Sequence, residues 1–186
     1  MAFKDTILTF EDDKIVSDDT YGEIEVMMSW ESPIMEKVAE YICQSKGDIL
    51  EIGFGMGICS DYIQAQNVNS HTIVEIHPQI IEKLKIWANN KSNVTVVEGD
   101  WSSVNSLSTY DGIFLDTFGD DNLDKYKEFV EQKAKSGAKV TYWNNYASQD
   151  NKYSFDNISF EEVDISPTIN MYTDLEGKYY MPKVVM

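Results

Sequence analysis

The segment "LEIGFGMGI", from Leu50 to Ile58, decides the fold of this chain. An apolar run ends in three glycines spaced two residues apart, Gly53, Gly55 and Gly57, and a helical pattern follows at once. Glycines between a strand and a helix let the backbone approach a ligand without interference from side chains. The segment therefore predicts the first strand, ligand-binding loop and helix of an α/β fold.

Apolar runs of strand length alternate with helical patterns through the middle of the chain. The predicted strands are DILEIG (48–53), HTIVEI (71–76), VTVVEG (94–99), GIFLD (112–116) and AKVTYW (138–143). The helical patterns cover residues 58–65, 80–88 and 123–134, and an earlier helix is expected to begin with Ser32 as N-cap and Pro33 in its first turn. This alternation predicts parallel βαβ units with helices on both faces of the sheet.

The two ends of the chain depart from this pattern. The runs ISFEEVDIS (158–166) and KYYMPKVVM (178–186) predict two further strands, paired as an antiparallel hairpin. Residues 1–25 are acidic with little periodicity, and they predict either an ordered lid or a loose tail. Because 186 residues suffice for one full core, we expect residues 26–186 to form a single domain.

The composition is strongly acidic, with a formal net charge of −17, and every basic residue is a lysine. This charge disfavours nucleic acid and anionic membrane surfaces as partners and favours a small cationic molecule. No stretch is apolar enough to span a bilayer, and no signal-peptide pattern is present. Cys43 and Cys59 are isolated, which predicts neither a disulfide nor a metal site. We expect a cytoplasmic protein, either monomer or homodimer.

Acidic residues stand at the carboxyl ends of three predicted strands. Glu51 lies just before the first glycine, Glu75 ends the second strand, and Asp100 with Trp101 follows the third. A carboxylate in the second position accepts hydrogen bonds from ribose hydroxyls. Asp100 can accept one from the exocyclic amine of adenine, and an indole can flank the ring. Since the short glycine spacing suits an amino-acid moiety better than a pyrophosphate, the set predicts an S-adenosylmethionine site.

Six motifs give the chain a resemblance to guanidinoacetate N-methyltransferase and to the fungal-type arginine N-methyltransferases. They are VMMSWESPIM (26–35), LEIGFGMGI (50–58), HTIVEIHP (71–78), EGDW (98–101), YDGIFLDTFGD (110–120) and KYYMP (178–182). The resemblance implies a Rossmann-like class I methyltransferase fold, with S-adenosylmethionine as cofactor and S-adenosylhomocysteine as its product. Relatives carry a longer helical segment after the fifth strand, so part of the acceptor wall is expected to be rebuilt here.

The resemblance also implies roles for individual residues. Glu31 and Asp116 match the acids that hold the acceptor guanidinium, and they are the expected catalytic residues; Trp30 and Tyr146 are the other expected acceptor contacts. The expected cofactor contacts are Met27, Met35, Glu51, Gly53, Phe54, Gly55, Met56, Gly57, Ile58, Glu75, Ile76, Asp100 and Trp101. No metal is expected.

Two carboxylates suit a guanidinium, which is planar, carries N–H donors in a fixed fork and stays charged. They also offset the repulsion between that cation and the cationic sulfonium of the methyl donor. Plainer interpretations stay open: Glu31 as an acid favoured near a helix N-terminus, Met27 and Met35 as core filler, and His71 and His77 as caps of the second strand. Guanidinoacetate is the expected lead acceptor. The alternatives are free or protein arginine, a small amine, or a non-catalytic S-adenosylmethionine-binding regulatory protein.

Overall fold

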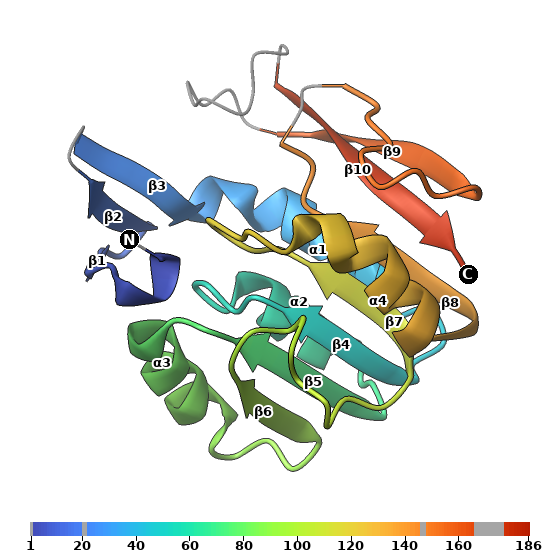
Figure 1. Ribbon diagram of the computed structural model, residues 1–186, viewed down its shortest axis with the longest axis horizontal. Coiled ribbons are helices and arrows are strands. Elements are labelled where there is room, and N and C mark those ends of the chain that lie inside the picture. Colours follow the sequence, from blue (N-terminus) through green and yellow to red (C-terminus); the bar gives the residue numbers. More distant parts are fainter. Residues whose placement is uncertain (1, 20–21, 146–147, 166–176) are drawn as a thin grey trace.

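The computed structural model describes residues 2–19, 22–145, 148–165 and 177–186, which form one large and one small β-sheet with helices packed on the large sheet (Figure 1). The helices are α1 (Ser32–Ile42), α2 (Ile58–Ala65), α3 (Pro78–Ala88) and α4 (Tyr126–Lys133), with the 3₁₀ turns η1 (Phe3–Asp5), η2 (Ser29–Glu31) and η3 (Leu123–Lys125). The strands are β1 (Leu8–Phe10), β2 (Lys14–Asp19), β3 (Gly22–Met28), β4 (Asp48–Ile52), β5 (Ser70–Glu75), β6 (Val94–Glu98), β7 (Tyr110–Leu115), β8 (Ala134–Tyr142), β9 (Ile158–Asp164) and β10 (Lys178–Val185).

The large sheet has the strand order β6-β5-β4-β7-β8-β10-β9. The first five strands in that order run parallel, whereas β10 pairs antiparallel with both β8 and β9. The predicted parallel βαβ core and the antiparallel C-terminal pair are both confirmed. Because the chain leaves β4 toward β5 and later returns to pair β7 on the other side of β4, the strand order reverses between β4 and β7. Ligands of open α/β sheets bind at the carboxyl ends of the strands at such a point.

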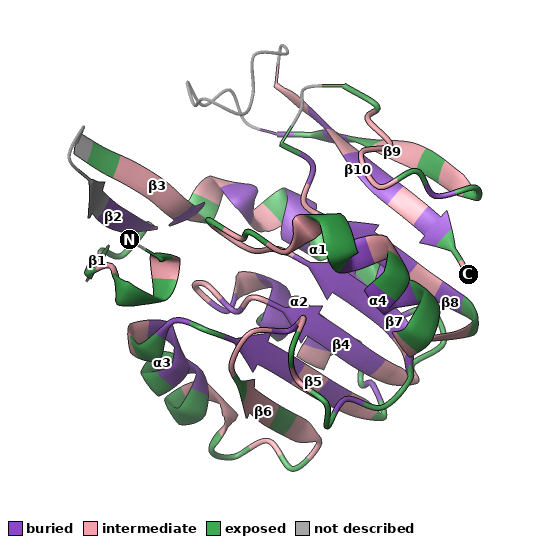
Figure 2. Cartoon of the chain, in the orientation of Figure 1, coloured by how far each residue is buried: buried purple, intermediate pink, exposed green. Residues whose placement is uncertain are grey.

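Helices cover both faces of this sheet, as the alternating pattern predicts. On one face α1 and α2 pack around Ile49 and Phe114, and α3 packs on Ile73. On the other face α4 packs with aromatic residues of two loops around Leu50 and Ile52. The central strands are buried along most of their length, while α3 and α4 expose their outer sides (Figure 2). The central strands, at whose ends the acids discussed below lie, are therefore packed on both faces.

The N-terminal residues form a separate three-stranded antiparallel sheet, β1-β2-β3. The side-chain amide of Gln79 joins this sheet to the start of α3: the Leu8 N–H donates to its Oε1 (2.8 Å), and its Nε2 donates to the Leu8 carbonyl (3.1 Å). The predicted division at residue 25 falls inside β3 and stays a prediction. In the described residues, however, this acidic stretch is ordered as strands.

Two local expectations are wrong. Ser32 is not an N-cap, because it already has helical dihedral angles and the cap position belongs to Glu31 at the end of η2. The Ser32 hydroxyl instead hydrogen-bonds the Tyr62 hydroxyl at 3.0 Å. The helix expected to run to Ala134 ends at Lys133, since Ala134 is extended and pairs with Tyr110 as the first residue of β8.

Candidate active site

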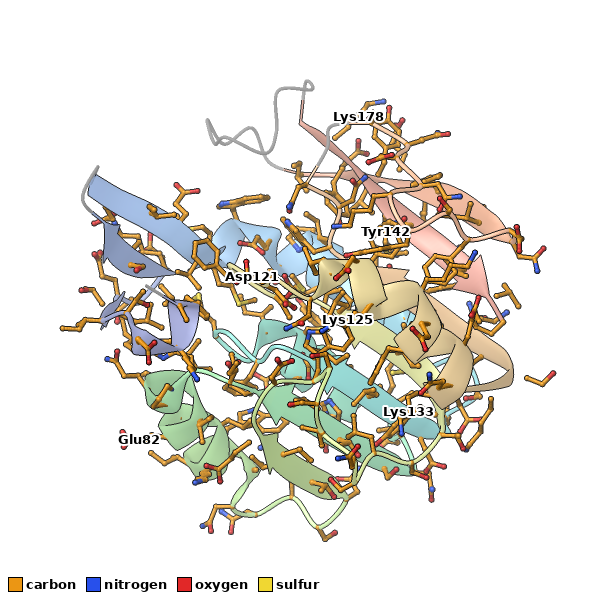
Figure 3. The ribbon with its side chains drawn as sticks, viewed as in Figure 1. Glu82, Asp121, Lys125, Lys133, Tyr142 and Lys178 are labelled. Carbon is orange, nitrogen blue, oxygen red and sulfur yellow. The ribbon has the colours of Figure 1, made fainter. Side chains whose placement is uncertain are left out.

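A cavity of about 640 Å³ opens at the carboxyl ends of β4, β5 and β7. Its walls come from the glycine loop, the ends of β5 and β6, the loop after β7, and, from the N-terminal sheet, η1 and the last residues of β3. Figure 3 shows side chains, Asp121 among them, between the N-terminal sheet and the loop after β7. A volume of this size is typical of a small-molecule or cofactor site.

The glycine loop is held between β7 and β3. Gly53 has φ +93°, and a Cβ there would lie 1.8 Å from the Asp116 carbonyl oxygen. Gly55 has φ +54°, and its Cβ would lie 2.2 Å from the sulfur of Met27. That sulfur also accepts the Met56 N–H at 3.0 Å. Only glycine fits these positions, so the sequence pattern reflects close approach of the backbone to its neighbours as well as to a ligand.

Glu51 lines the cavity from β4 yet is only 1% exposed. Its Oε2 accepts the Ser60 hydroxyl at 2.5 Å and lies 2.9 Å from Nε2 of His71. Nδ1 of His71 lies 3.1 Å from the Gln64 amide, and the ring is fully buried. His71 is therefore not a strand cap but the buried partner that fixes Glu51. His77 is a cap, but of helix α3 and not of the strand, because its ring accepts the Gln79 N–H at the start of α3.

Glu75 ends β5 with its carboxylate turned toward the glycine loop. Oε2 accepts the Phe54 N–H at 2.9 Å, and Oε1 accepts the N–H groups of Ile76 and His77, both at 2.8 Å. Burial raises the pKa of Glu75, and these three donors oppose the rise. A carboxylate has about four acceptor positions, so three backbone donors leave room for one more, such as a hydroxyl of a bound ligand.

Asp100 and Trp101 line the cavity just after the end of β6. Asp100 accepts the Ser102 N–H at 2.8 Å and the Asn122 amide at 3.0 Å. The indole N–H of Trp101 donates to Asp120 at 2.6 Å, and its ring packs edge-on against Phe129. The indole is thus fixed in the wall by the loop after β7.

Two acids from distant parts of the chain, Glu31 and Asp116, line the same cavity. Glu31 follows β3 and is 7% exposed, with its Oε1 accepting the Met28 N–H at 2.8 Å. Asp116 follows β7 and is partly open to the cavity. Burial raises the pKa of Glu31 well above its usual value, and the charges of Asp116 and Glu25 raise it further. Burial, with the charges of Glu51 and Glu75, raises the pKa of Asp116 to about 7, although Lys152 opposes the rise.

The expected site residues fall into three groups. Those that line the cavity are Met27, Glu31, Glu51, Gly53, Phe54, Gly55, Glu75, Ile76, Asp100, Trp101 and Asp116. Those outside its lining are Trp30, Met35, Met56, Gly57 and Ile58. Met35 is fully buried in the core beneath α1, and Gly57 is the N-cap of α2. Tyr146 lies outside the described residues. The contacts of all these residues with ligands stay predictions.

Several lining residues were missed from the sequence. Phe3 and Lys4 come from η1, Glu25 comes from β3, and residues 117–123 come from the loop after β7. The alternation in "GEIEVMM" (22–28) was the available signal for a strand that presents Glu25 and Met27. Among the charged side chains that line the cavity, all but Lys4 are acids, so the cavity attracts cations.

In the part of the chain that the structure describes, no group of three or more His, Cys, Asp or Glu residues is placed to hold a metal ion. No helix in those same ranges is long and apolar enough to cross a membrane. The thiols of Cys43 and Cys59 are free and buried.

Comparison with known proteins adds three findings. The family model of guanidinoacetate N-methyltransferase matches residues 12–176. The chain is 36% identical over 138 residues to protein arginine N-methyltransferase 2 of Aspergillus oryzae, covering 70% of this chain and 32% of that protein. For the Saccharomyces cerevisiae protein of the same name the identity is 37% over 141 residues, covering 67% and 34%. The chain thus spans about a third of the length of these relatives.

Among solved structures, the fold resembles the N-methyltransferase NodS from Bradyrhizobium japonicum WM9 in complex with S-adenosyl-L-homocysteine. The TM-score is 0.64 at 10% sequence identity, covering 84% of this chain and 87% of NodS. At this identity the likeness shows the fold alone, and it confirms the class I methyltransferase architecture.

Proposed function

The chain belongs to the guanidinoacetate N-methyltransferase family, and on that premise we propose that it transfers a methyl group from S-adenosylmethionine to a guanidino nitrogen. The observation that carries the proposal is the convergence of Glu31 and Asp116 in one cavity with the glycine loop. These acids come from segments more than eighty residues apart in the sequence, yet the charge of Asp116 raises the pKa of Glu31.

The lining residues fit S-adenosylmethionine. Glu75 has one acceptor position left for a ribose hydroxyl, and Asp100 and Trp101 offer an acceptor and an aromatic face beyond it. Glu51, fixed by His71, faces the cavity from beneath the glycine loop, where it suits the positively charged amino group of the donor's amino-acid moiety. Bound there, S-adenosylmethionine supplies a methyl group on a cationic sulfur.

Glu31 and Asp116 hold the guanidinium in this proposal, one carboxylate at each edge of its N–H fork, and so orient the third nitrogen. Much of the rate gain then comes from positioning and from charge placement in a partly dry cavity. A cationic guest also lowers the raised pKa values of both acids, so that the occupied site holds two carboxylates.

Asp116 is the proposed proton acceptor. A free guanidinium loses its proton far above neutral pH, so a carboxylate cannot deprotonate it beforehand. The proton must leave as the N–C bond forms or afterwards. Since Asp116 is held as a carboxylate in the occupied site, it can accept the proton as that proton leaves.

Guanidinoacetate remains our lead acceptor within this proposal. The names of the fungal relatives favour arginine within a protein as the second candidate. The acidic lining supports a small cationic guest over nucleic acid or an anionic membrane surface. We place the protein in the cytoplasm, a reducing compartment in which Cys43 and Cys59 stay thiols.

The decisive experiment is an acceptor panel with isotope-labelled S-adenosylmethionine. Guanidinoacetate, arginine, agmatine, an arginine-containing peptide and plain amines are compared at equal concentration. We expect transfer to at least one guanidine, and we expect Asp116→Asn to abolish that transfer while calorimetry still detects cofactor binding. Turnover limited to non-guanidine amines, or normal turnover by Asp116→Asn, would refute the proposal.

A further inference from the structure

A partly buried lysine, Lys152, lies in the loop that follows β8, and its charge acts on Asp116. Its ammonium donates to the carbonyl of Trp143 at 3.1 Å. The same ammonium lies 4.9 Å from the ring centre of Tyr153 and 5.4 Å from that of Tyr142. A carbonyl and two aromatic faces therefore hold this cation in one place.

The carbonyl that Lys152 contacts is beside Asp116 by the register of the sheet. Tyr142 pairs with Leu115 across β7 and β8, and the Trp143 N–H donates to the Leu115 carbonyl at 2.8 Å. Trp143 and Asp116 are thus the next residues along two neighbouring parallel strands, and both line the cavity. The ammonium of Lys152 therefore contacts the strand residue that neighbours Asp116, the proposed proton acceptor.

In the described residues, three charged groups shift the pKa of Asp116, and Lys152 is the cation among them; the other two, Glu51 and Glu75, are acids. The charge of Asp116 in turn raises the pKa of Glu31, Cys59 and Tyr179. Burial lowers the pKa of Lys152, but the charges of Asp150 and Asp116 favour its protonated form.

We propose that Lys152 is a positioning residue of the acceptor site, whose charge favours the ionised form of Asp116 and so sets the lower pH limit for binding and methylating a guanidine. This inference rests on the proposed function and deepens it. The lysine has two opposite effects on a cationic acceptor: it favours the anionic form of Asp116, and it repels the acceptor itself. Its net effect should therefore change sign with pH.

The experiment compares wild type with Lys152→Met and Lys152→Arg, and with Lys127→Met as matched control. Lys127 also donates to a backbone carbonyl of this loop, that of Ser154 at 2.7 Å, but it is not among the groups whose charge reaches Asp116. For Lys152→Met we expect the acidic limb of kcat/KM to move up by about one pH unit. Above that limb, we expect KM for the guanidine to be equal or lower, so that the two profiles cross.

Lys152→Arg should restore the wild-type profile, and Lys127→Met should leave it unchanged. A purely structural role for Lys152 would lower activity at every pH and would leave the limb where it is. That result, or no rescue by arginine, would overturn the inference.

A second readout does not depend on turnover. The side-chain carboxyl of Asp116, assigned through Asp116→Asn, is titrated by ¹³C NMR in wild type and in Lys152→Met. We expect the midpoint of this titration to rise in Lys152→Met. If it rises although no guanidine is methylated, the proposed function fails, while the effect of Lys152 on the ionisation of Asp116 stands. An unchanged midpoint overturns the inference even where methyl transfer is observed.

Discussion

The contact between His71 and Glu51 makes a quantitative prediction about stability. Both side chains are essentially inaccessible, at 0% and 1% exposure, and 2.9 Å separates Nε2 from Oε2. Replacing the imidazole by leucine fills much of its space but removes the donor, which leaves Glu51 with the Ser60 hydroxyl on the same oxygen. Removing one partner of a buried hydrogen bond, so that the other group loses it, costs about 1–3 kcal/mol.

We therefore expect His71→Leu to lower the free energy of unfolding by about 1–3 kcal/mol. For a chain of this length each kcal/mol shifts the melting temperature by roughly 2–4 °C, so the variant should melt about 2–12 °C lower. Urea unfolding followed by tryptophan fluorescence measures the free energy, and calorimetry measures the melting temperature. His71→Gln, which keeps an amide donor, is the control and should lose less.

A double-mutant cycle isolates the contact itself. Glu51→Gln removes the charge, so adding His71→Leu to it should cost at least 1 kcal/mol less than in the wild-type background. Additive losses in the cycle, or a loss below about 1 kcal/mol for His71→Leu alone, would show that the pair does not stabilise the folded state.

Two other predictions concern the cavity. Glu75→Ala should weaken S-adenosylmethionine binding by about 1–3 kcal/mol in calorimetry and also lower stability, because three buried N–H groups lose their acceptor. Glu75→Gln should lower affinity with less loss of stability. Unchanged affinity in both variants would remove Glu75 from the binding site. Gly53→Ala should destabilise more than Gly55→Ala in urea unfolding, since its Cβ would meet the Asp116 backbone oxygen, whereas that of Gly55 would meet the flexible end of Met27. For Gly55→Ala the left-handed backbone alone should cost about 1–2 kcal/mol, and equal losses in the two variants would contradict this order.

The core of the fold could be predicted because its signals are local. An apolar run that ends in glycine, followed by a helical pattern, specifies β4 and α2 within a few residues, and the same alternation specifies β5 to β8. The extent of β8 could not be read this way. Its first residues, "AKSG", have no strand periodicity, and they are extended because Ala134 pairs with Tyr110.

Spacing and pattern alone pointed to cavity-lining acids where a residue lies at or near the end of a central strand, whereas Glu31 was expected only from the family resemblance. Glu51, Glu75 and Asp116 meet that condition, and the topology brings them together. Glu25 does not, because its place in the wall depends on how the N-terminal sheet packs across the cavity. His71 was misinterpreted for a similar reason: its partner Glu51 lies one strand away, at a distance that periodicity does not report.

The amide of Gln79 holds Leu8 in the way that a neighbouring strand would, with one donor and one acceptor. Nε2 of His77 lies 3.2 Å from the Thr6 carbonyl at the same edge, so two side chains at the start of α3 hold the N-terminal residues. In the described residues the two sheets share no strand pairing. The backbone ladder of the large sheet is therefore complete without the small one, and a substitution of Gln79 should loosen β1 while leaving that ladder intact.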